Sequence, residues 1–171
     1  ANSGSDRTRP VALDLEAFLE FRRRGALIVD VRPAEEFAAG HLRGALNLVL
    51  NDEFSRWAGA FLEHGVPVLI VSSSTEDRTA TDAAARLGRL GLDLVQGFLD
   101  GGMAAARGRR DLVETTRQCS TQAIQRRLRQ AEPPLIVDVR TSSEFAAAHV
   151  VGAVSIPLGV LWDRAGELPM G

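Results

Sequence analysis

The chain has 171 residues, of which 45% are hydrophobic and 25% are charged, and its formal net charge is -2. This composition is typical of a globular protein with one or two domains, and it gives no reason to expect a nucleic-acid partner or a membrane-spanning segment. The single cysteine, Cys119, excludes an intrachain disulfide and fits a cytoplasmic location.

The first part of the chain predicts a linker, a helix and a buried strand. Residues 1–10 are small and polar, as expected of a tag or linker. Asp14 is placed to cap a helix whose apolar positions are Leu15, Phe18 and Leu19. The continuous apolar run 27–31 that follows predicts a strand buried on both faces.

The next elements alternate between helical and extended patterns. Pro33 predicts a helix start, and Gly40 predicts its end before an apolar run over 45–50. Helix-spaced apolar residues predict a helix over 54–62. Further on we expect a strand over 66–71, a polar loop over 72–79, a helix over 80–87 ended by Gly91, a strand over 92–95 and a turn at Gly101–Gly102. This alternation predicts an α/β fold with a parallel sheet covered on both faces.

The stretch Leu27–Leu48 occurs a second time as Leu135–Ile156. Six residue types recur at a constant offset of 108 positions: Asp30 and Asp138, Arg32 and Arg140, Glu36 and Glu144, Phe37 and Phe145, His41 and His149, and Gly44 and Gly152. Ser120 or Thr121 is placed to cap the helix that precedes the second copy. The offset indicates an internal duplication with two tandem domains.

Each copy resembles the N-terminal signature of rhodanese-like domains, through Asp-Val-Arg after the strand, Glu-Phe in the helix, and a histidine followed by Gly-Ala. The resemblance implies a duplicated three-layer α/β domain with a central parallel sheet. The first domain would span 11–112. The second would span 113–171 and hold only the N-terminal half of the fold, so that we expect a fragment of a longer protein. A partner copy, for example by strand exchange, could complete the second half.

In rhodanese-like enzymes, the strand that corresponds to 66–71 is followed by a loop with a cysteine, which takes a sulfur atom from a donor such as thiosulfate and carries it as a persulfide. Here that loop contains no cysteine and reads Ser72, Ser73, Ser74, Thr75, Glu76, Asp77, Arg78 and Thr79. Alignment on Gly91 puts the cysteine position at Ser74, whereas alignment on Arg78 puts it at Ser72 or Ser73. A hydroxyl is a much weaker nucleophile than a thiolate and cannot carry a persulfide. The resemblance therefore implies a domain that is inactive in transfer from a small sulfur-containing anion.

A second interpretation treats the same loop as a binding site. The spacing from Ser72 to Arg78 resembles the cysteine-x5-arginine loop of phosphatases with this fold, with serine in place of cysteine. Such a module would bind an anion or a partner without catalysis, although Glu76 and Asp77 disfavour a phosphate. His64 has no sequence link to the loop as a catalytic base. Cys119 aligns with Val11, where we expect a packing role.

The shared signature residues are expected to have structural roles. Asp30 and Asp138 can accept backbone N–H bonds, and the following arginines can pair with Glu36 and Glu144. His41 and His149 are expected to anchor a turn. Because the histidines stand apart from any cysteine or acidic cluster, we expect no metal and no cofactor.

Two further segments resemble a particular group of rhodanese-like proteins. Residues 52–59 and 97–102 are similar to the rhodanese pair that follows a metallo-β-lactamase-like domain in bacterial sulfur-metabolism proteins. In that group the metal domain acts as a persulfide dioxygenase or thioester hydrolase. Any transferring cysteine lies in the last rhodanese domain. The resemblance implies a metallo-β-lactamase-like partner domain in the parent protein.

Overall fold

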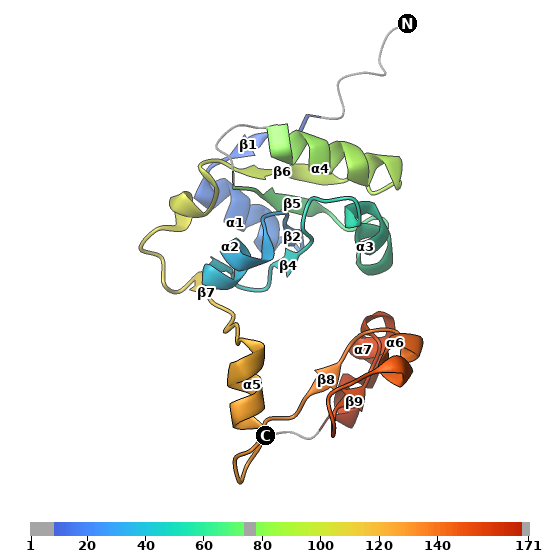
Figure 1. Cartoon of the computed structure of the whole chain (residues 1–171). Coiled ribbons are helices and arrows are strands. Elements are labelled where there is room, and N and C mark those ends of the chain that lie inside the picture. The colour runs from blue at the N-terminus through green and yellow to red at the C-terminus, as the bar shows by residue number, and fades with distance from the viewer. Residues whose placement is uncertain (1–8, 74–77, 169–171) are drawn as a thin grey trace, which may run out of the picture. The chain divides into compact units, whose positions relative to one another are not determined.

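The computed structural model describes residues 9–73 and 78–168. It contains two compact units, Ala1–Gln118 and Cys119–Gly171, which are described separately (Figure 1). Strand β7 (Val113–Glu114) belongs to the first unit, because it pairs antiparallel with β3 (His41–Leu42). Two backbone bonds support this pairing, from Arg43 N to Leu112 O and from Thr116 N to Ala38 O.

The first unit is built on a five-stranded sheet with the order β1-β6-β5-β2-β4. Its strands are β1 (Ala12–Leu13), β2 (Leu27–Asp30), β4 (Leu46–Asn47), β5 (Val68–Val71) and β6 (Val95–Leu99). Every neighbouring pair is parallel, with Leu27 opposite Val68 and Val29 opposite Leu46. The predicted α/β class with a central parallel sheet is therefore confirmed.

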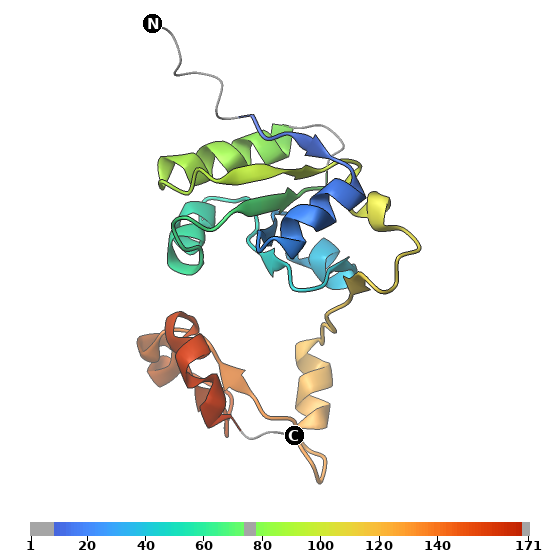
Figure 2. The ribbon, with the colours of Figure 1, turned by 180° about the vertical axis from the view of Figure 1, so that it is seen from behind.

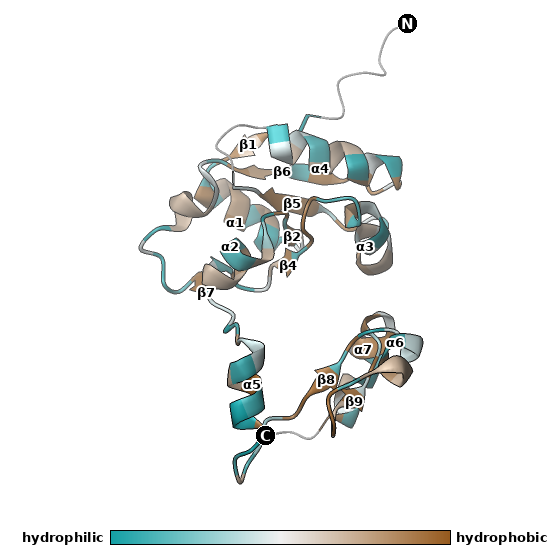
Figure 3. Cartoon of the chain, viewed as in Figure 1, coloured by the Kyte–Doolittle hydropathy of each residue, from teal (hydrophilic) through white to brown (hydrophobic). Residues whose placement is uncertain are grey.

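Helices cover both faces of this sheet, as strands buried on both sides require. The helical elements are α1 (Leu15–Arg23), α2 (Ala34–Ala39), α3 (Phe54–Phe61), α4 (Arg78–Arg89) and the 3-10 helix η1 (Gly102–Ala106). Phe18 of α1 and Ala106 of η1 pack with Ile28 and Leu69, whereas residues of α3 and α4 pack with Val29 and Ile70. Figure 2 shows α1 in front of the sheet, and Figure 3 shows the central strands as the apolar layer between helices with polar outer faces.

Several local predictions are confirmed by the backbone. Asp14 caps α1, because its side chain accepts a hydrogen bond from Ala17 N at 2.8 Å. Gly91 ends α4 in the left-handed region, with φ +74°. Gly101 and Gly102 form a turn in which both residues have positive φ.

Other predictions are wrong in position. The last strand spans Val95–Leu99 rather than 92–95, because Gln96 and Gly97 interrupt its apolar run. Gly97 is required there, since a Cβ atom would collide with the carbonyl oxygen of Val11. The predicted helix end at Gly40 is confirmed, because Gly40 is the C-cap of α2, but its φ of 170° is one that any residue can adopt, and its equivalent in the second copy is an alanine. Arg78 and Thr79 belong to α4 and not to the preceding loop.

The second unit repeats the start of the first. It contains α5 (Thr121–Arg127), β8 (Val137–Asp138), α6 (Ser142–Ala147), β9 (Val154–Ser155), η2 (Leu158–Val160), α7 (Leu161–Arg164) and η3 (Ala165–Glu167). Ser120 caps α5 by accepting from Ala123 N at 3.2 Å. Strands β8 and β9 are parallel, with Val137 opposite Val154, in the register that β2 and β4 have in the first unit.

The second unit buries little apolar surface within its described residues. Ile156 is its one fully buried large hydrophobic side chain in the described part, 119–168. Large apolar side chains remain exposed at Leu135, Val139, Val150, Val151, Val154 and Val160.

Candidate functional site

The candidate site lies at the carboxyl edge of the first unit's sheet, where parallel strands bring their ends together. Strand β2 leads into Arg32, β5 leads into Ser72, and β6 leads into the turn at Gly102. Ser72 is buried, and a Cβ atom at Gly102 would lie 2.7 Å from the carbonyl oxygen of Ser72. The glycine turn after β6 is therefore packed directly against the start of the loop.

The structure describes only the first two residues of the loop between β5 and α4. Ser72 and Ser73 follow β5, whereas Ser74, Thr75, Glu76 and Asp77 lie outside the described residues. The choice among Ser72, Ser73 and Ser74 as the cysteine position stays a prediction.

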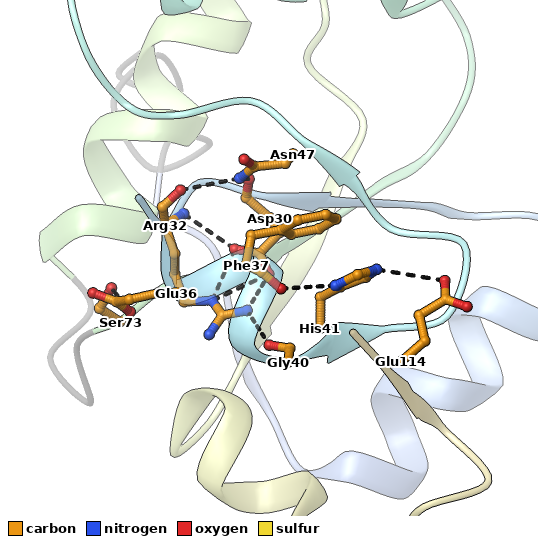
Figure 4. Close-up of polar contacts among 9 residues, drawn as sticks. All are labelled: Asp30, Arg32, Glu36, Phe37, Gly40, His41, Asn47, Ser73 and Glu114. Carbon is orange, nitrogen blue, oxygen red and sulfur yellow. Dashed lines mark hydrogen bonds and ion pairs between the residues drawn. The ribbon is translucent and has the colours of Figure 1, made fainter. Parts of the chain in front are cut away.

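Glu36 is held against this loop. The hydroxyl of Ser73 donates a hydrogen bond of 2.8 Å to Oε2 of Glu36, which lies in the first turn of α2 (Figure 4). The contact places a carboxylate beside the loop residue that follows Ser72. A negative charge at this position opposes the approach of an anion.

Asp30 and Arg32 form a buried ion pair at the end of β2. Arg32 Nη2 lies 2.6 Å from Asp30 Oδ2, and Nε lies 2.9 Å from Oδ1. The backbone N–H of Arg32 also donates to Oδ1, as predicted for the carboxylate. The predicted pairing of Arg32 with Glu36 is wrong. Arg32 pairs with Asp30 and spans instead to the carbonyl oxygen of Gly40 at 2.8 Å.

His41 fixes the turn after α2. Its Nδ1 lies 2.8 Å from the carbonyl oxygen of Phe37, and the two rings stack with centroids 3.7 Å apart. On the other side Nε2 lies 3.5 Å from Oε1 of Glu114 on β7. The imidazole therefore connects α2 to the β3–β7 pair and is turned away from the loop (Figure 4).

The second copy forms the same contacts in a more exposed setting. Arg140 Nη2 lies 2.6 Å from Asp138 Oδ2 and 2.7 Å from the carbonyl oxygen of Ala148. The Arg140 side chain is 47% exposed, against 7% for Arg32. His149 Nδ1 lies 2.8 Å from the carbonyl oxygen of Phe145, and their rings stack.

One sequence difference between the two copies explains why Glu36 and Glu144 have different hydrogen-bond partners. Thr141 stands where the first copy has Pro33, and it forms a capping box with Glu144 at the start of α6. The predicted pairing of Arg140 with Glu144 is thus replaced by contacts of Arg140 with Asp138 and of Glu144 with Thr141. Pro33 offers no hydroxyl, so that Glu36 in the first copy is left to bind Ser73.

These contacts shift the acidity of the second copy. The hydrogen bond from Arg140 lowers the pKa of Asp138 below its ordinary value, and the hydrogen bond from Thr141 lowers the pKa of Glu144. The bond to Asp138 in turn raises the pKa of Arg140.

The remaining candidates lie away from the loop. His64 Nε2 lies 3.1 Å from the carbonyl oxygen of Leu90, beyond the end of α4. Cys119 is exposed, so the expected packing role is wrong; the second unit places no core around this position.

Within 9–73 and 78–168, no group of three or more His, Cys, Asp or Glu side chains could hold a metal ion. No helix in those ranges is long and apolar enough to cross a membrane.

Comparison with known families matches the rhodanese-like domain to residues 14–108 and again to 120–170, which is most of the chain. The chain belongs to the rhodanese-like family. Its two matched segments correspond to the two copies of the Asp-Val-Arg signature. This rhodanese-like protein therefore carries the family pattern twice.

Solved structures agree on the fold. The crystal structure of the Alr3790 protein from Anabaena sp. is 24% identical, with a TM-score of 0.50, and the match covers 60% of this chain and 88% of that one. The structure of wild-type EanB is 14% identical, with a TM-score of 0.54, over 91% of this chain and 42% of the other. At this level of identity the likeness shows the fold alone.

A curated relative matches part of the rhodanese-like chain. An HTH-type transcriptional regulator of Mycobacterium tuberculosis is 38% identical over 58 residues, which are 34% of this chain. The match spans 26% of the regulator's length.

Proposed function

We propose that residues 11–112 form a rhodanese-like domain that does not transfer sulfur. The observation that carries this proposal is the loop after β5, where Ser72 and Ser73 follow the strand and the sequence continues with Ser74 and Thr75. Sulfur transfer in this family needs a thiolate that attacks the donor and holds the sulfur as a persulfide. A serine oxygen cannot form that S–S bond.

The charge beside the loop supports the same proposal. Glu36 is bound to Ser73 at 2.8 Å, so a carboxylate lies where a negatively charged sulfur donor would approach. The sequence adds Glu76 and Asp77 to the same loop. At the loop itself, both the nucleophile and the electrostatic attraction for an anion are therefore missing. The same carboxylates disfavour the alternative role of the loop as a phosphate-binding module.

Intact mass spectrometry tests the proposal directly. The chain is incubated with thiosulfate and then with cyanide, in wild-type form and as Cys119→Ser. We expect no mass gain of one sulfur atom and no thiocyanate from either protein. A cyanide-labile sulfur on the wild type would contradict the proposal, and its loss in Cys119→Ser would assign it to the exposed thiol.

A series of cysteine substitutions tests whether the missing thiol and the charge of Glu36 each prevent sulfur transfer. In the Cys119→Ser background, Ser72→Cys, Ser73→Cys and Ser74→Cys are each compared with the same change combined with Glu36→Gln. We expect a persulfide in one position only, with a higher yield when Glu36 is neutral. Equal yields with and without Glu36→Gln would show that its charge does not oppose the donor.

We further infer that this protein works as a rhodanese-family segment beside a metallo-β-lactamase-like domain in sulfur metabolism. The support is the similarity of 52–59 and 97–102 to that group. The parent open reading frame tests this proposal. A metal-binding domain before the segment and a cysteine loop near residue 180 would support a sulfurtransferase in which the first domain is silent. A second serine loop would favour a module without sulfur transfer.

A further inference from the structure

An open, shallow cavity of about 530 Å³ lies at the surface of the first unit. It lies between the end of α2 and the segment from η1 to β7. Met103, Ala106 and Val113 give it an apolar floor. Its volume is within the range of cavities that hold small organic molecules.

The cavity is bordered by arginines on one segment. Arg107, Arg109 and Arg110 all line it. Arg109 is engaged by Asp111 at 3.0 Å and Glu16 at 3.3 Å. Arg107 and Arg110 are exposed, and neither forms an ion pair within the described part of the chain. Two uncompensated positive charges therefore flank the apolar floor.

Arg32 adds a buried donor at the inner wall. The residue is 6% exposed and lines the cavity, and its Nε and Nη2 atoms are used by Asp30 and Gly40. Its third nitrogen, Nη1, has no acceptor among residues 9–73 and 78–168. No fully buried side-chain nitrogen or oxygen in those ranges lacks a partner, so Nη1 is not fully buried, and the residue that carries it lines the cavity. Figure 4 shows this guanidinium nitrogen outside the dashed contacts.

The lining contains one acid, Glu36, whose single negative charge is outnumbered by the positive charges of Arg107 and Arg110. Glu36 is bound to the hydroxyl of Ser73. Arginine has a planar guanidinium that matches the geometry of a carboxylate. The cavity thus combines a donor at its wall, cations at its border and an apolar floor.

We propose that this cavity binds an organic anion, an apolar body that carries one carboxylate. The carboxylate would meet Arg32 Nη1 and the guanidinium groups of Arg107 and Arg110, and the apolar body would cover Met103 and Val113. A bare inorganic anion would leave this floor uncovered. The proposal goes beyond the lost sulfur chemistry, since it uses no thiol and no atom of residues 72–77.

Two probes that differ only in charge test the site. The full chain is titrated with 1-naphthoate and with the neutral 1-naphthamide, and amide NMR shifts are recorded. We expect saturable shifts from naphthoate at Gly40 and over 103–108, and binding of naphthamide that is weaker by about tenfold or more. Equal affinity for the two probes would overturn the proposal.

Matched variants locate the contacts. The double variant Arg107→Gln/Arg110→Gln should weaken naphthoate binding by about tenfold or more, whereas naphthamide binding should stay unchanged. Met103→Gln should weaken both probes. Arg56→Gln is the control, because Arg56 is also exposed but lies on α3, paired with Glu53. Arg56, Arg107 and Arg110 are all exposed, so the arginine variants should keep the amide NMR spectrum of the folded protein.

Three other results would also contradict the site. Shifts confined to the exposed apolar residues of 119–168 would assign the probe to that surface. An affinity for naphthoate that Arg107→Gln/Arg110→Gln leaves unchanged would remove the role of the arginines. Displacement of naphthoate by equimolar thiosulfate would indicate a simple anion site. None of these results bears on the mass test of sulfur transfer, so the two proposals fail separately.

Discussion

Asp30 and Asp138 make the same contacts in surroundings of very different polarity. In both copies the arginine two residues after the aspartate lies 2.6 Å from its carboxylate. The same arginine donates a hydrogen bond to the carbonyl oxygen of the residue eight positions further along the chain. Only the first pair is enclosed by a complete sheet. A buried ion is far more costly to leave unpaired than an exposed one, which water can solvate. The two copies thus provide a matched pair within one chain.

We predict that Asp30→Asn lowers the free energy of unfolding of the first unit by about 3–5 kcal/mol, because it leaves Arg32 buried without its counter-ion. Asp138→Asn should cost much less, since Arg140 remains in contact with water. Urea unfolding followed by hydrogen exchange of peptides from each unit measures both. Equal losses would contradict the role of burial.

Acid should weaken the second copy through Asp138 and Glu144. Folding lowers both pKa values from their ordinary 3.8 and 4.5, through Arg140 and Thr141 respectively. The unfolded chain then binds more protons in this range, so the stabilisation is present above these ordinary values and is lost as the pH falls through the lowered ones. Carboxyl carbon NMR titration should give pKa values below 3.8 and 4.5. Thr141→Val should return Glu144 toward its ordinary value and leave Asp138 unchanged.

Two glycines near the end of α2, Gly40 and Gly44, have different backbone conformations. Gly44 has φ +73°, as does its equivalent Gly152 with φ +82°, and both belong to the left-handed region. Gly40 has an extended backbone, and a Cβ atom there would lie 3.6 Å from a methyl group of Val113, an ordinary contact. The requirement for glycine therefore applies to the turn and not to the helix end.

Alanine at these two positions should have different consequences for stability. Gly44→Ala is expected to lower the free energy of unfolding by about 1–2 kcal/mol, because an L-residue is strained at positive φ. Gly40→Ala should be neutral, because alanine already occupies the equivalent position, Ala148, in the second copy. The urea midpoint of the first unit measures the difference. A loss at Gly40 as large as that at Gly44 would contradict the backbone assignment.

The elements that sequence reasoning found are those with a continuous periodic pattern. The apolar run at β2, the helical spacing from Phe54 to Leu62, and the cap at Asp14 depend on neighbouring residues alone. Strand β6 was misplaced because its position depends on pairing with β1 and β5 and on the close approach of Gly97 to Val11. The two-residue strands β3 and β7 have no pattern of their own and exist only through their long-range pairing.

Sequence reasoning located the edge of the sheet that holds the candidate site, but not its contacts. The duplicated signature identified Asp30, Arg32, Glu36 and His41 as a group. The partner of Glu36 could not be predicted, since it depends on Pro33 lacking a hydroxyl and on where Ser73 lies in space. The cavity arginines were missed because they follow the last strand and become neighbours of Arg32 only through the fold.

At the scale of the whole molecule, the two copies differ in how much core they enclose. The first unit has apolar clusters on both faces of its sheet. The described part of the second unit, 119–168, has two strands, and large apolar side chains are exposed along it. An exposed apolar surface of this kind is typical of interaction sites. Completion of the second copy by a partner, including strand exchange, stays a prediction.

Separated units should behave differently. We expect a fragment of residues 9–118 to unfold cooperatively in urea, because it contains its own core. A fragment of 119–168 should unfold without a cooperative transition and self-associate at high concentration, as the exposed valines favour. Circular dichroism and light scattering measure these outcomes. A monomeric, cooperative second fragment would show that it needs no partner.

The ion pair and stacked histidine of each copy are held by contacts that are short along the chain. Arg32 reaches Asp30 two residues away and Gly40 eight residues away, and His41 reaches Phe37 four residues away. Closing loops of this size has a small entropic cost and is complete long before distant strands can meet. The second copy forms the same contacts with little burial around them. We therefore expect folding of this chain to have two starting points with the same local contacts, of which only the first is extended into a five-stranded sheet in the described residues.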